Sequence, residues 1–322
     1  MIAVAGEALF DLVVTPDGQV GARMGGAGYN TVRTLARLDS QATFLERLSE
    51  DGFGRLLRGR LDAEGVVLGV PRPSAAPSTL AVADVDAAGV ASYSFYLDGT
   101  AAADLCYEDL RAALPRDVSA VHTGCLALLL EPSGSAIERL LLEDIPAEVL
   151  VMLDPNCRPG AVADPAAYRA RIQRIASRAN VVKASVEDLA YLYPGTPPAQ
   201  AAAALLAAGP ALVLVTDGPR PATAYMADGV LTAEAPVVTV ADTIGAGDAF
   251  GGAFLAWWAA NGRTVGDLKH PAAVTAALQA AVAVAALTCT RPGADPPTLA
   301  EVRARGWWPA DFDAAHGRLP GG

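Results

Sequence analysis

The 322-residue sequence predicts an α/β fold around a mostly parallel β-sheet, on three observations. Short runs rich in β-branched residues alternate with longer runs rich in Ala, Leu and Arg, which is typical of βαβ units with right-handed crossovers. Hydrophobic residues make up 52% of the chain and charged residues 18%, which provides a large core and argues against disorder. The stretch 78–98 instead alternates with period two, which indicates a hairpin outside the main sheet.

The elements of the main sheet follow from these runs. Strands are expected at Ile2–Ala5, Ala42–Leu45, Val118–His122, Val149–Leu153, Val181–Val182 and Leu212–Thr216. Helices are expected at Tyr29–Leu38, Phe53–Glu64, Ser133–Leu142, Pro165–Ser177, Ser185–Tyr191, Ala199–Ala207 and Ala249–Ala259.

Two hairpins interrupt this order early in the chain. Residues 78–98 form two alternating runs around Asp86-Ala87-Ala88-Gly89, and Leu12–Val20 forms a second short pair around Pro16-Asp17-Gly18. Together they predict a small projecting sheet, with strands from about 12–22 and 78–98, that serves as a lid over a site. An edge hairpin without a catalytic role is the alternative. The whole chain, residues 1–322, is then expected to be one α/β domain with this lid, ending in a loose tail from Gly306 that Trp307 and Trp308 anchor.

Composition excludes several classes of function. The 24 basic and 35 acidic residues give a net charge of −11, which argues against a nucleic-acid partner. The four cysteines are widely spaced with no C-x-x-C motif, so neither a zinc site nor a disulfide framework is expected. The N-terminus lacks the features of a signal peptide, and the longest apolar runs are too short or too broken to cross a bilayer. A soluble, cytoplasmic protein without a membrane partner is expected.

The strongest motif is the run Asp242-Thr-Ile-Gly-Ala-Gly-Asp-Ala-Phe-Gly-Gly-Ala-Phe254, which leads from glycines into an apolar helix. Gly245 and Gly247 let the N–H groups of Ala246, Gly247 and Asp248 converge at the helix N-terminus, where unpaired donors and the helix dipole favour a phosphoryl group. Asp248 then lies in the first turn. It either caps the helix or receives the proton of an attacking hydroxyl.

A second glycine motif precedes the first helix. Gly25-Gly26-Ala27-Gly28-Tyr29-Asn30 is followed by Asp51-Gly52-Phe53-Gly54. A dinucleotide-binding fold would need G-x-G-x-x-G directly after the first strand, but that strand ends in Ala5-Gly6-Glu7. The sequence therefore disfavours a dehydrogenase.

Taken together, the two motifs resemble those of the ribokinase/PfkB family of carbohydrate kinases, and the resemblance extends from Gly6 to about Val302. It implies a ribokinase-like three-layer α/β/α sandwich and ATP-dependent phosphorylation of a sugar's primary hydroxyl, with ATP and Mg²⁺ as cofactors. It assigns catalysis to Asp248 as base and to the anion site of Gly245, Ala246 and Gly247.

The resemblance also implies a sugar site. Asp154-Pro155-Asn156-Cys157-Arg158 follows a buried strand, where α/β sheets place ligands, and is similar to the D-P-N-x-R segment of fructokinase-like members. Asp11 offers two carboxylate oxygens to a diol. The implied sugar-binding residues are Asp11, Gly25, Gly26, Asn30, Tyr96, Asn156, Arg158 and Asp248.

The nucleotide and metal sites come from the same resemblance. Lys183-Ala184-Ser185-Val186-Glu187-Asp188 resembles the family's K-x-S-x-E-E segment, with Asp188 where glutamate is usual, and implies a magnesium contact through water. The loop after Val215 resembles V-T-x-G-x-x-G, with Pro221 in place of the second glycine. The implied nucleotide-binding residues are Lys183, Ser185, Thr216, Gly218, Arg220, Gly245 and Gly247. A monovalent cation such as K⁺ is implied at Asp242 and at backbone carbonyls of Ile244, Thr288, Arg291 and Gly293.

The identity of the sugar depends on finer resemblances. The segments 95–101, 154–158 and 290–294 resemble fructokinase-like members, and Leu97 stands where 2-keto-3-deoxygluconate kinases tend to carry arginine. Fructose is therefore the predicted acceptor. Ribose, 2-keto-3-deoxygluconate or a nucleoside remain as alternatives, as does a catalytically silent sugar sensor, which the intact motif around Asp248 disfavours. The exposed lid hairpins also allow a homodimer.

Overall fold

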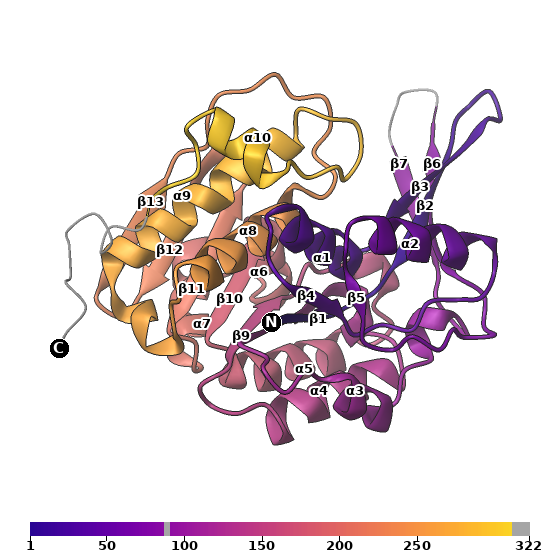
Figure 1. Ribbon diagram of the computed structural model, residues 1–322, viewed down its shortest axis with the longest axis horizontal. Coiled ribbons are helices and arrows are strands. Elements are labelled where there is room, and N and C mark those ends of the chain that lie inside the picture. The colour runs from indigo at the N-terminus through magenta and orange to yellow at the C-terminus, as the bar shows by residue number, and fades with distance from the viewer. Residues whose placement is uncertain (87–90, 311–322) are drawn as a thin grey trace.

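The first strand shows how the core is divided. All four residues of β1 (Ile2–Ala5) are buried, because helices cover both faces of its sheet. Ile2 and Val4 belong to one core cluster, and Ala3 and Ala5 to the other, as the period-two geometry of a strand requires. In this computed structural model, which describes residues 1–86 and 91–310, the result is three layers with the sheet in the middle (Figure 1).

The central sheet of the described residues has nine strands in the order β13-β12-β11-β10-β9-β8-β1-β4-β5. Neighbours from β11 to β5 are parallel, and β12 and β13 add an antiparallel edge. The remaining strands of this sheet are β4 (Ala42–Phe44), β5 (Val67–Leu68), β8 (Ala120–Gly124), β9 (Leu150–Asp154), β10 (Val181–Ser185), β11 (Leu212–Asp217), β12 (Arg220–Met226) and β13 (Gly229–Ala233).

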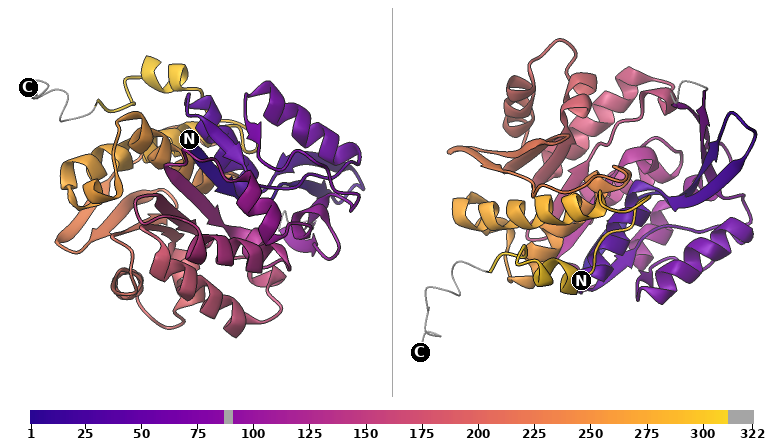
Figure 2. Two further views of the ribbon diagram at one scale, coloured as in Figure 1. Left: turned by 60° about the horizontal axis from the view of Figure 1, so that its bottom comes forward. Right: turned by 90° about the horizontal axis from the view of Figure 1, so that it is seen from above.

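Helices from the two ends of the chain cover one face of the sheet, and those from the middle cover the other (Figure 2). The first group is α1 (Ala27–Arg37), α2 (Gly52–Ala63), α8 (Ala246–Ala260), α9 (Pro271–Thr288) and α10 (Leu299–Ala304). The second group is α3 (Tyr107–Ala113), α4 (Ser133–Glu143), α5 (Pro165–Arg178), α6 (Val186–Leu192) and α7 (Pro198–Ala207). Short 3-10 helices lie at η1 (Ala101–Ala103), η2 (Cys125–Leu128), η3 (Pro159–Ala161) and η4 (Val265–Lys269).

The order of the strands fixes where a ligand can bind. The chain runs outward from β1 to β4 and β5 in one direction, and from β8 to β11 in the other. The crevice outside the carboxyl ends of the strands at such a reversal is the usual ligand site of an open α/β sheet. Here that edge carries the ends of β8, β9 and β10.

A second sheet projects beside this edge (Figure 1). Its described strands, in the order β3-β2-β6-β7, are β3 (Val20–Gly25), β2 (Leu9–Val14), β6 (Thr79–Val85) and β7 (Ala91–Tyr96). The two predicted hairpins thus form one sheet, since β2 pairs in parallel with β6. The first hairpin is longer than the expected span of about 12–22 because its register runs from Leu9 opposite Gly25. The predicted turn at Asp86–Gly89 falls largely outside the described residues.

The sequence analysis did not predict β5, β12, β13, α3, α9 or α10. α9 is 18 residues long and apolar enough to cross a membrane by length and composition, but 72% of it is buried inside the protein, so it is a core helix. Apolar residues lie on all sides of α9, so its sequence lacks the amphipathic 3.6-residue period by which helices are predicted. Trp307 and Trp308 pack against the core, and the Trp257 side chain donates to Pro309 O over 3.0 Å, which attaches the described end of the tail.

Candidate active site

The glycine loop before α8 forms a phosphate-sized anion site. Gly245 is the N-cap residue with φ 77°, a left-handed conformation that favours glycine. A Cβ at this position would lie 2.5 Å from Cβ of Ala294, so the loop also needs glycine for packing. The N–H groups of Ala246, Gly247 and Asp248 occupy the first turn, where no intrahelical acceptor precedes them, and the Ala246 N–H also donates to Thr243 O over 3.3 Å. These donors and the helix dipole suit a transferring phosphoryl group.

Asp248 lies in this first turn as a buried carboxylate. Its Oδ2 accepts a hydrogen bond from Asn30 Nδ2 at 2.8 Å, and its Oδ1 lies 3.4 Å from Asn156 Nδ2. Burial raises the pKa of Asp248 to about 7, and the hydrogen bond from Asn30 opposes that rise. A carboxylate with a pKa near neutral pH, beside an anion site, suits a general base. Among the described residues this carboxylate accepts from these two asparagine side chains and not from a backbone N–H group of α8, so capping of the helix by Asp248 is not observed.

Asp11 lies in the lid strand β2. The chain leaves β1 at Gly6, where the backbone of Gly28 approaches so closely that a Cβ would lie 2.8 Å from its Cα. Burial raises the pKa of Asp11 to about 6, and the charges of Arg158 and Arg23 oppose that rise. The lid therefore contributes a carboxylate to the site.

The glycine pair of the first motif fits around Asp11 and the backbone of β1–β2. A Cβ on Gly25 would lie 2.2 Å from Asp11 Oδ2. Gly26 has φ 105°, and a Cβ there would lie 2.5 Å from the carbonyl oxygen of Glu7. Gly26 thus requires glycine, whereas a side chain at Gly25 would displace the Asp11 carboxylate. α1 begins directly after Gly26, so that Asn30 faces Asp248.

Asn156 and Arg158 extend from the end of β9. Asn156 adopts φ 40°, a conformation that asparagine tolerates better than most residues. Its Oδ1 accepts a hydrogen bond from Arg158 Nη1 at 2.6 Å. The structure therefore brings Asn156 and Arg158 together next to Asp248, as expected for residues of one sugar site.

Lys183, an expected nucleotide ligand, forms a buried ion pair. Its ammonium is 2.8 Å from Asp154 Oδ2, and the two side chains are 4% and 3% exposed. Burial opposes the charge, but Asp154 raises the pKa of Lys183 above its ordinary value and keeps it protonated. Lys183 lies next to the glycine loop of the anion site, since a Cβ added to Gly247 would be 2.9 Å from Lys183 Nζ.

Ser185 and Asp188 form the capping box of α6. Ser185 Oγ accepts from the Asp188 N–H, and Asp188 Oδ2 accepts from the Ser185 N–H at 2.8 Å. The other carboxylate oxygen of Asp188 accepts from the Cys157 N–H at 2.6 Å. Each oxygen keeps lone pairs beyond these bonds, so Asp188 fits a contact to magnesium-bound water. Glu187, next to it, is exposed.

The loop after β11 holds the other expected nucleotide residues. Thr216 pairs in register with Ser185, which puts the two hydroxyl groups on neighbouring strand ends. Gly218 turns the chain with φ 53°. Arg220 begins β12 and forms an exposed ion pair with Asp217 at 2.5 Å. Its guanidinium is therefore engaged within the hairpin.

Asp242 ties the start of the glycine loop to the segment after α9. Its Oδ1 accepts from the Ile244 N–H at 3.0 Å and its Oδ2 from the Gly293 N–H at 2.8 Å. This brings together the segments of the expected cation cage, whose oxygen donors suit a hard cation. The side chain of Arg291, by contrast, turns to Glu301 at 2.5 Å, which leaves only its carbonyl for such a role.

Arg23 is a residue that the sequence analysis missed. It projects from the lid strand β3, opposite Asp11, and its Nη1 is 3.6 Å from Asp242 Oδ2. The lid thus contacts the glycine loop directly. Asp154, at the end of β9, was also missed as a site residue.

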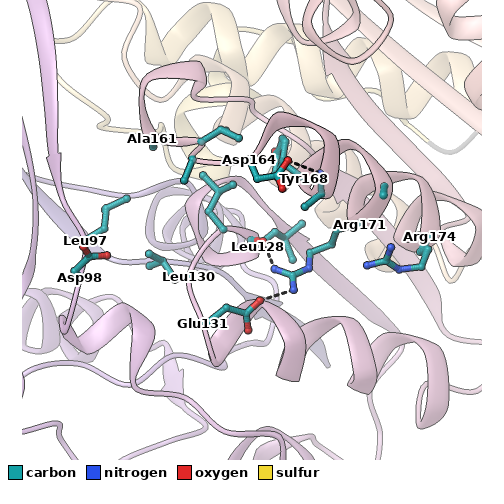
Figure 3. A pocket seen from close by; sticks show the side chains of 15 residues that line it. Leu97, Asp98, Leu128, Leu130, Glu131, Ala161, Asp164, Tyr168, Arg171 and Arg174 are labelled. Carbon is teal, nitrogen blue, oxygen red and sulfur yellow. Dashed lines mark hydrogen bonds and ion pairs between the residues drawn. The ribbon is translucent and has the colours of Figure 1, made fainter.

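Tyr96, the last residue of β7, is 61% exposed and lies on the lid surface. A cavity of about 420 Å³ lies nearby, between the segment after β7, the 128–131 loop and α5 (Figure 3). Arg171 crosses it to donate to Leu128 O at 2.8 Å and pair with Glu131. The residues that line this cavity include none of the predicted site residues, so it is separate from the site around Asp248.

Known proteins are similar to this chain in sequence and architecture. The profile of the pfkB family carbohydrate kinases matches residues 1–301. A fructokinase of Rhizobium leguminosarum bv. trifolii is 36% identical over 260 residues, which are 80% of this chain and 79% of the relative. The crystal structure of a Xylella fastidiosa fructokinase with bound ATP has a TM-score of 0.86 at 29% identity, covering 94% of this chain and 97% of that one.

A further structure, a double-mutant fructokinase from Vibrio cholerae O395 with fructose, ADP and potassium bound, has a TM-score of 0.82 at 26% identity, covering 94% and 97% of the two chains. With these matches, the fold and the site around Asp248 define a carbohydrate kinase, a phosphotransferase with an alcohol group as acceptor. The chain belongs to the pfkB family of carbohydrate kinases. The predicted enzyme class and ribokinase-like fold are confirmed.

Proposed function

We propose that this enzyme transfers the γ-phosphoryl group of ATP to a primary hydroxyl of fructose, with Asp248 as general base. The observation that carries the proposal is the buried Asp248 carboxylate directly beside the N–H groups of the α8 N-terminus. The hydroxyl proton moves to Asp248, the hydroxyl oxygen forms a bond to phosphorus, and the bond from phosphorus to the β–γ bridging oxygen breaks to leave ADP. The N–H groups of residues 246–248 stabilise charge on the phosphoryl group.

The proposed sugar contacts come from both sheets. Asp11 on the lid accepts hydrogen bonds from sugar hydroxyls, and Asn30, Asn156 and Arg158 hold the sugar from the central sheet, with Gly25 and Gly26 admitting it close to the backbone. Tyr96 closes the lid side. Fructose is favoured by the fructokinase relatives and by the fructose bound to the Vibrio cholerae enzyme. An apolar, partly buried Leu97 gives no cation for the carboxylate of a sugar acid.

For the nucleotide, we propose that Ser185, Thr216, Gly218 and Arg220 line the ATP site beyond Gly245 and Gly247. Lys183 contributes positive charge from beneath the loop. Mg²⁺, when bound, neutralises charge on the β- and γ-phosphates, and Asp188 orients its water ligands. Potassium at Asp242 and the carbonyls of Ile244, Thr288, Arg291 and Gly293 is supported by the potassium bound to the Vibrio cholerae relative.

We also propose that the enzyme works in the cytoplasm without a nucleic-acid or membrane partner, as a homodimer through the lid. Exposed Val20, Tyr93 and Tyr96 on the lid sheet support the dimer. Sedimentation of the wild type and of Tyr93→Ser/Tyr96→Ser tests it, and a wild-type monomer at micromolar concentration contradicts it.

The decisive test is a panel of acceptors with ATP and Mg²⁺: fructose, ribose, adenosine, 2-keto-3-deoxygluconate and tagatose, with ADP release measured. Fructose is expected to give the largest kcat/KM. Asp248→Asn is expected to lower kcat by about 10² or more, with a modest change in ATP affinity. The control is Asp164→Asn, an exposed N-cap of α5 that accepts from the Ala166 and Ala167 N–H groups, where asparagine caps as well.

Each outcome of the panel decides between the alternatives. Another sugar with the highest kcat/KM replaces fructose as the acceptor. Calorimetric binding of a sugar without ADP release from any acceptor would establish the silent sensor. Near-wild-type turnover of Asp248→Asn contradicts the role of Asp248.

A further inference from the structure

A buried ion pair lies directly beneath the glycine loop. Asp154 ends β9 and Lys183 lies in the middle of β10, and the two side chains meet at 2.8 Å because the strands are parallel neighbours. Both side chains are almost fully excluded from solvent. Placing two such charges in the interior has a large desolvation cost, which their mutual attraction offsets.

The pair is placed to act on Asp248. The Lys183 ammonium lies against Gly247, the residue before Asp248. A Cβ added to Gly247 would be only 2.9 Å from Lys183 Nζ. The charge of Lys183 lowers the pKa of Asp248 and the charge of Asp154 raises it, both less than burial does. Two opposite charges from adjacent strands therefore flank one carboxylate.

Few other groups face Asp248. Asn30 approaches from α1, Asn156 and Arg158 from the loop after β9, and Cys125 from η2. Arg158 lies among the proposed sugar-binding residues. Its charge lowers the pKa of Asp248, as that of Lys183 does, but its side chain is partly exposed.

His122 on β8 faces Lys183 rather than Asp248. Burial, with the nearby Lys183 charge, lowers the pKa of His122 to about 3, so the imidazole is neutral. Neither of its ring nitrogens has a hydrogen-bonding partner among the described residues, nor does Asp154 Oδ1. Lys183 and Asp154 thus pair with each other, and the neutral His122 adds no charge. Asp188 on α6 is a second negative charge near the pair, which raises the pKa of both Asp154 and Lys183.

We propose that Lys183 and Asp154 are positioning residues that act on Asp248 as opposed charges, Lys183 favouring its ionised form and Asp154 its protonated form. This inference rests on the proposed role of Asp248 as base. It gives Lys183 a function that does not require contact with the nucleotide. The pair adjusts the pH at which the base becomes available.

The test is the pH profile of kcat/KM for fructose, measured with ATP and Mg²⁺ for the wild type and variants. The acidic limb of the wild type is expected near pH 7. Lys183→Met is expected to move this limb up by about one pH unit, and the isosteric Asp154→Asn to move it down by a similar amount. The double variant is expected to return toward the wild-type limb, and Lys183→Arg to retain it.

A purely structural pair would lower turnover or stability in both single variants without shifting the limb in opposite directions. Equal shifts, or none, in the two single variants overturn the inference. If Lys183→Met fails to fold, as judged by thermal unfolding, the shift in Asp154→Asn and the retained limb in Lys183→Arg decide it. Failure of the proposed function is seen separately, as undiminished turnover in Asp248→Asn.

Discussion

Asn30 and Asp248 lie 218 positions apart in sequence and are joined by a 2.8 Å hydrogen bond between Nδ2 and Oδ2. This bond connects α1, which follows the glycine pair of the sugar side, to α8, which begins at the phosphate side. It also orients the carboxylate and lowers its pKa against the effect of burial. Asn30 and Asp248, the polar residues that end the two glycine motifs, therefore connect the motifs into one site.

Replacing Asn30 with Ala is expected to lower kcat/KM for the sugar about tenfold, the equivalent of about 1.4 kcal/mol, and to move the acidic limb to higher pH. The lost donor no longer favours the Asp248 carboxylate. Steady-state kinetics between pH 5.5 and 9 measures both effects. Thr34→Ser, which keeps the hydroxyl that donates to Asn30 O, is the control and should leave the limb in place.

Gly25→Ala is expected to raise KM for the sugar several-fold and to leave KM for ATP nearly unchanged. The added methyl group lies 2.2 Å from Asp11 Oδ2 and displaces that carboxylate from the sugar pocket. Gly21→Ala, on the same strand, is a matched control, since its methyl group meets no described atom within 4 Å. Equal KM values for the sugar in the two variants would show that Asp11 does not bind it.

Gly245→Ala is expected to reduce both turnover and stability. Its φ of 77° costs a non-glycine residue about 1–2 kcal/mol, and its methyl group meets Ala294 at 2.5 Å. Gly262→Ala shares the left-handed conformation, with φ 63°, but its methyl group would lie more than 4 Å from any described atom. Urea unfolding of both variants, with ADP release, separates the conformational cost from the collision. Equal losses in the two variants would mean that the contact with Ala294 is unimportant.

The raised pKa of Asp248 predicts how stability depends on pH. The native state keeps the Asp248 proton up to about pH 7, whereas the unfolded chain releases it near 3.8. This contribution to stability is present below pH 4 and is lost as the pH rises through 7; Asp11, with a pKa of about 6, acts in the same direction.

Asp248→Asn cannot ionise, so it should gain stability relative to the wild type at pH 8 by a few kcal/mol more than at pH 5. Urea unfolding at the two pH values measures the difference. A gain that is the same at both values would indicate that Asp248 is ionised in the native state throughout.

The local patterns predicted much of this enzyme, and the failures have physical causes. The β-branched runs located six of the seven parallel strands of the described sheet, and β5 (Val67–Leu68) was missed because two residues are too few to form such a run. They missed β12 and β13, whose Pro221 and glycine interrupt the pattern at an exposed edge. The pairing of Lys183 with Asp154 depends on strand order, which no local pattern contains. The same is true of Arg23 and Asp242, which meet across the two sheets.

The bond from the Gly293 N–H to Asp242 has a consequence for synthesis of the protein on the ribosome. Domains fold as the chain emerges from the N-terminus. The lid, β1 and its neighbours β4 and β8 are complete once residue 124 has been made. The phosphate loop, in contrast, is supported by Ala294 and Gly293, which are among the last tenth of the chain. The lid strands that carry Asp11 are thus synthesised long before the residues that support the phosphate loop, and the site is complete only when nearly the whole chain has been made.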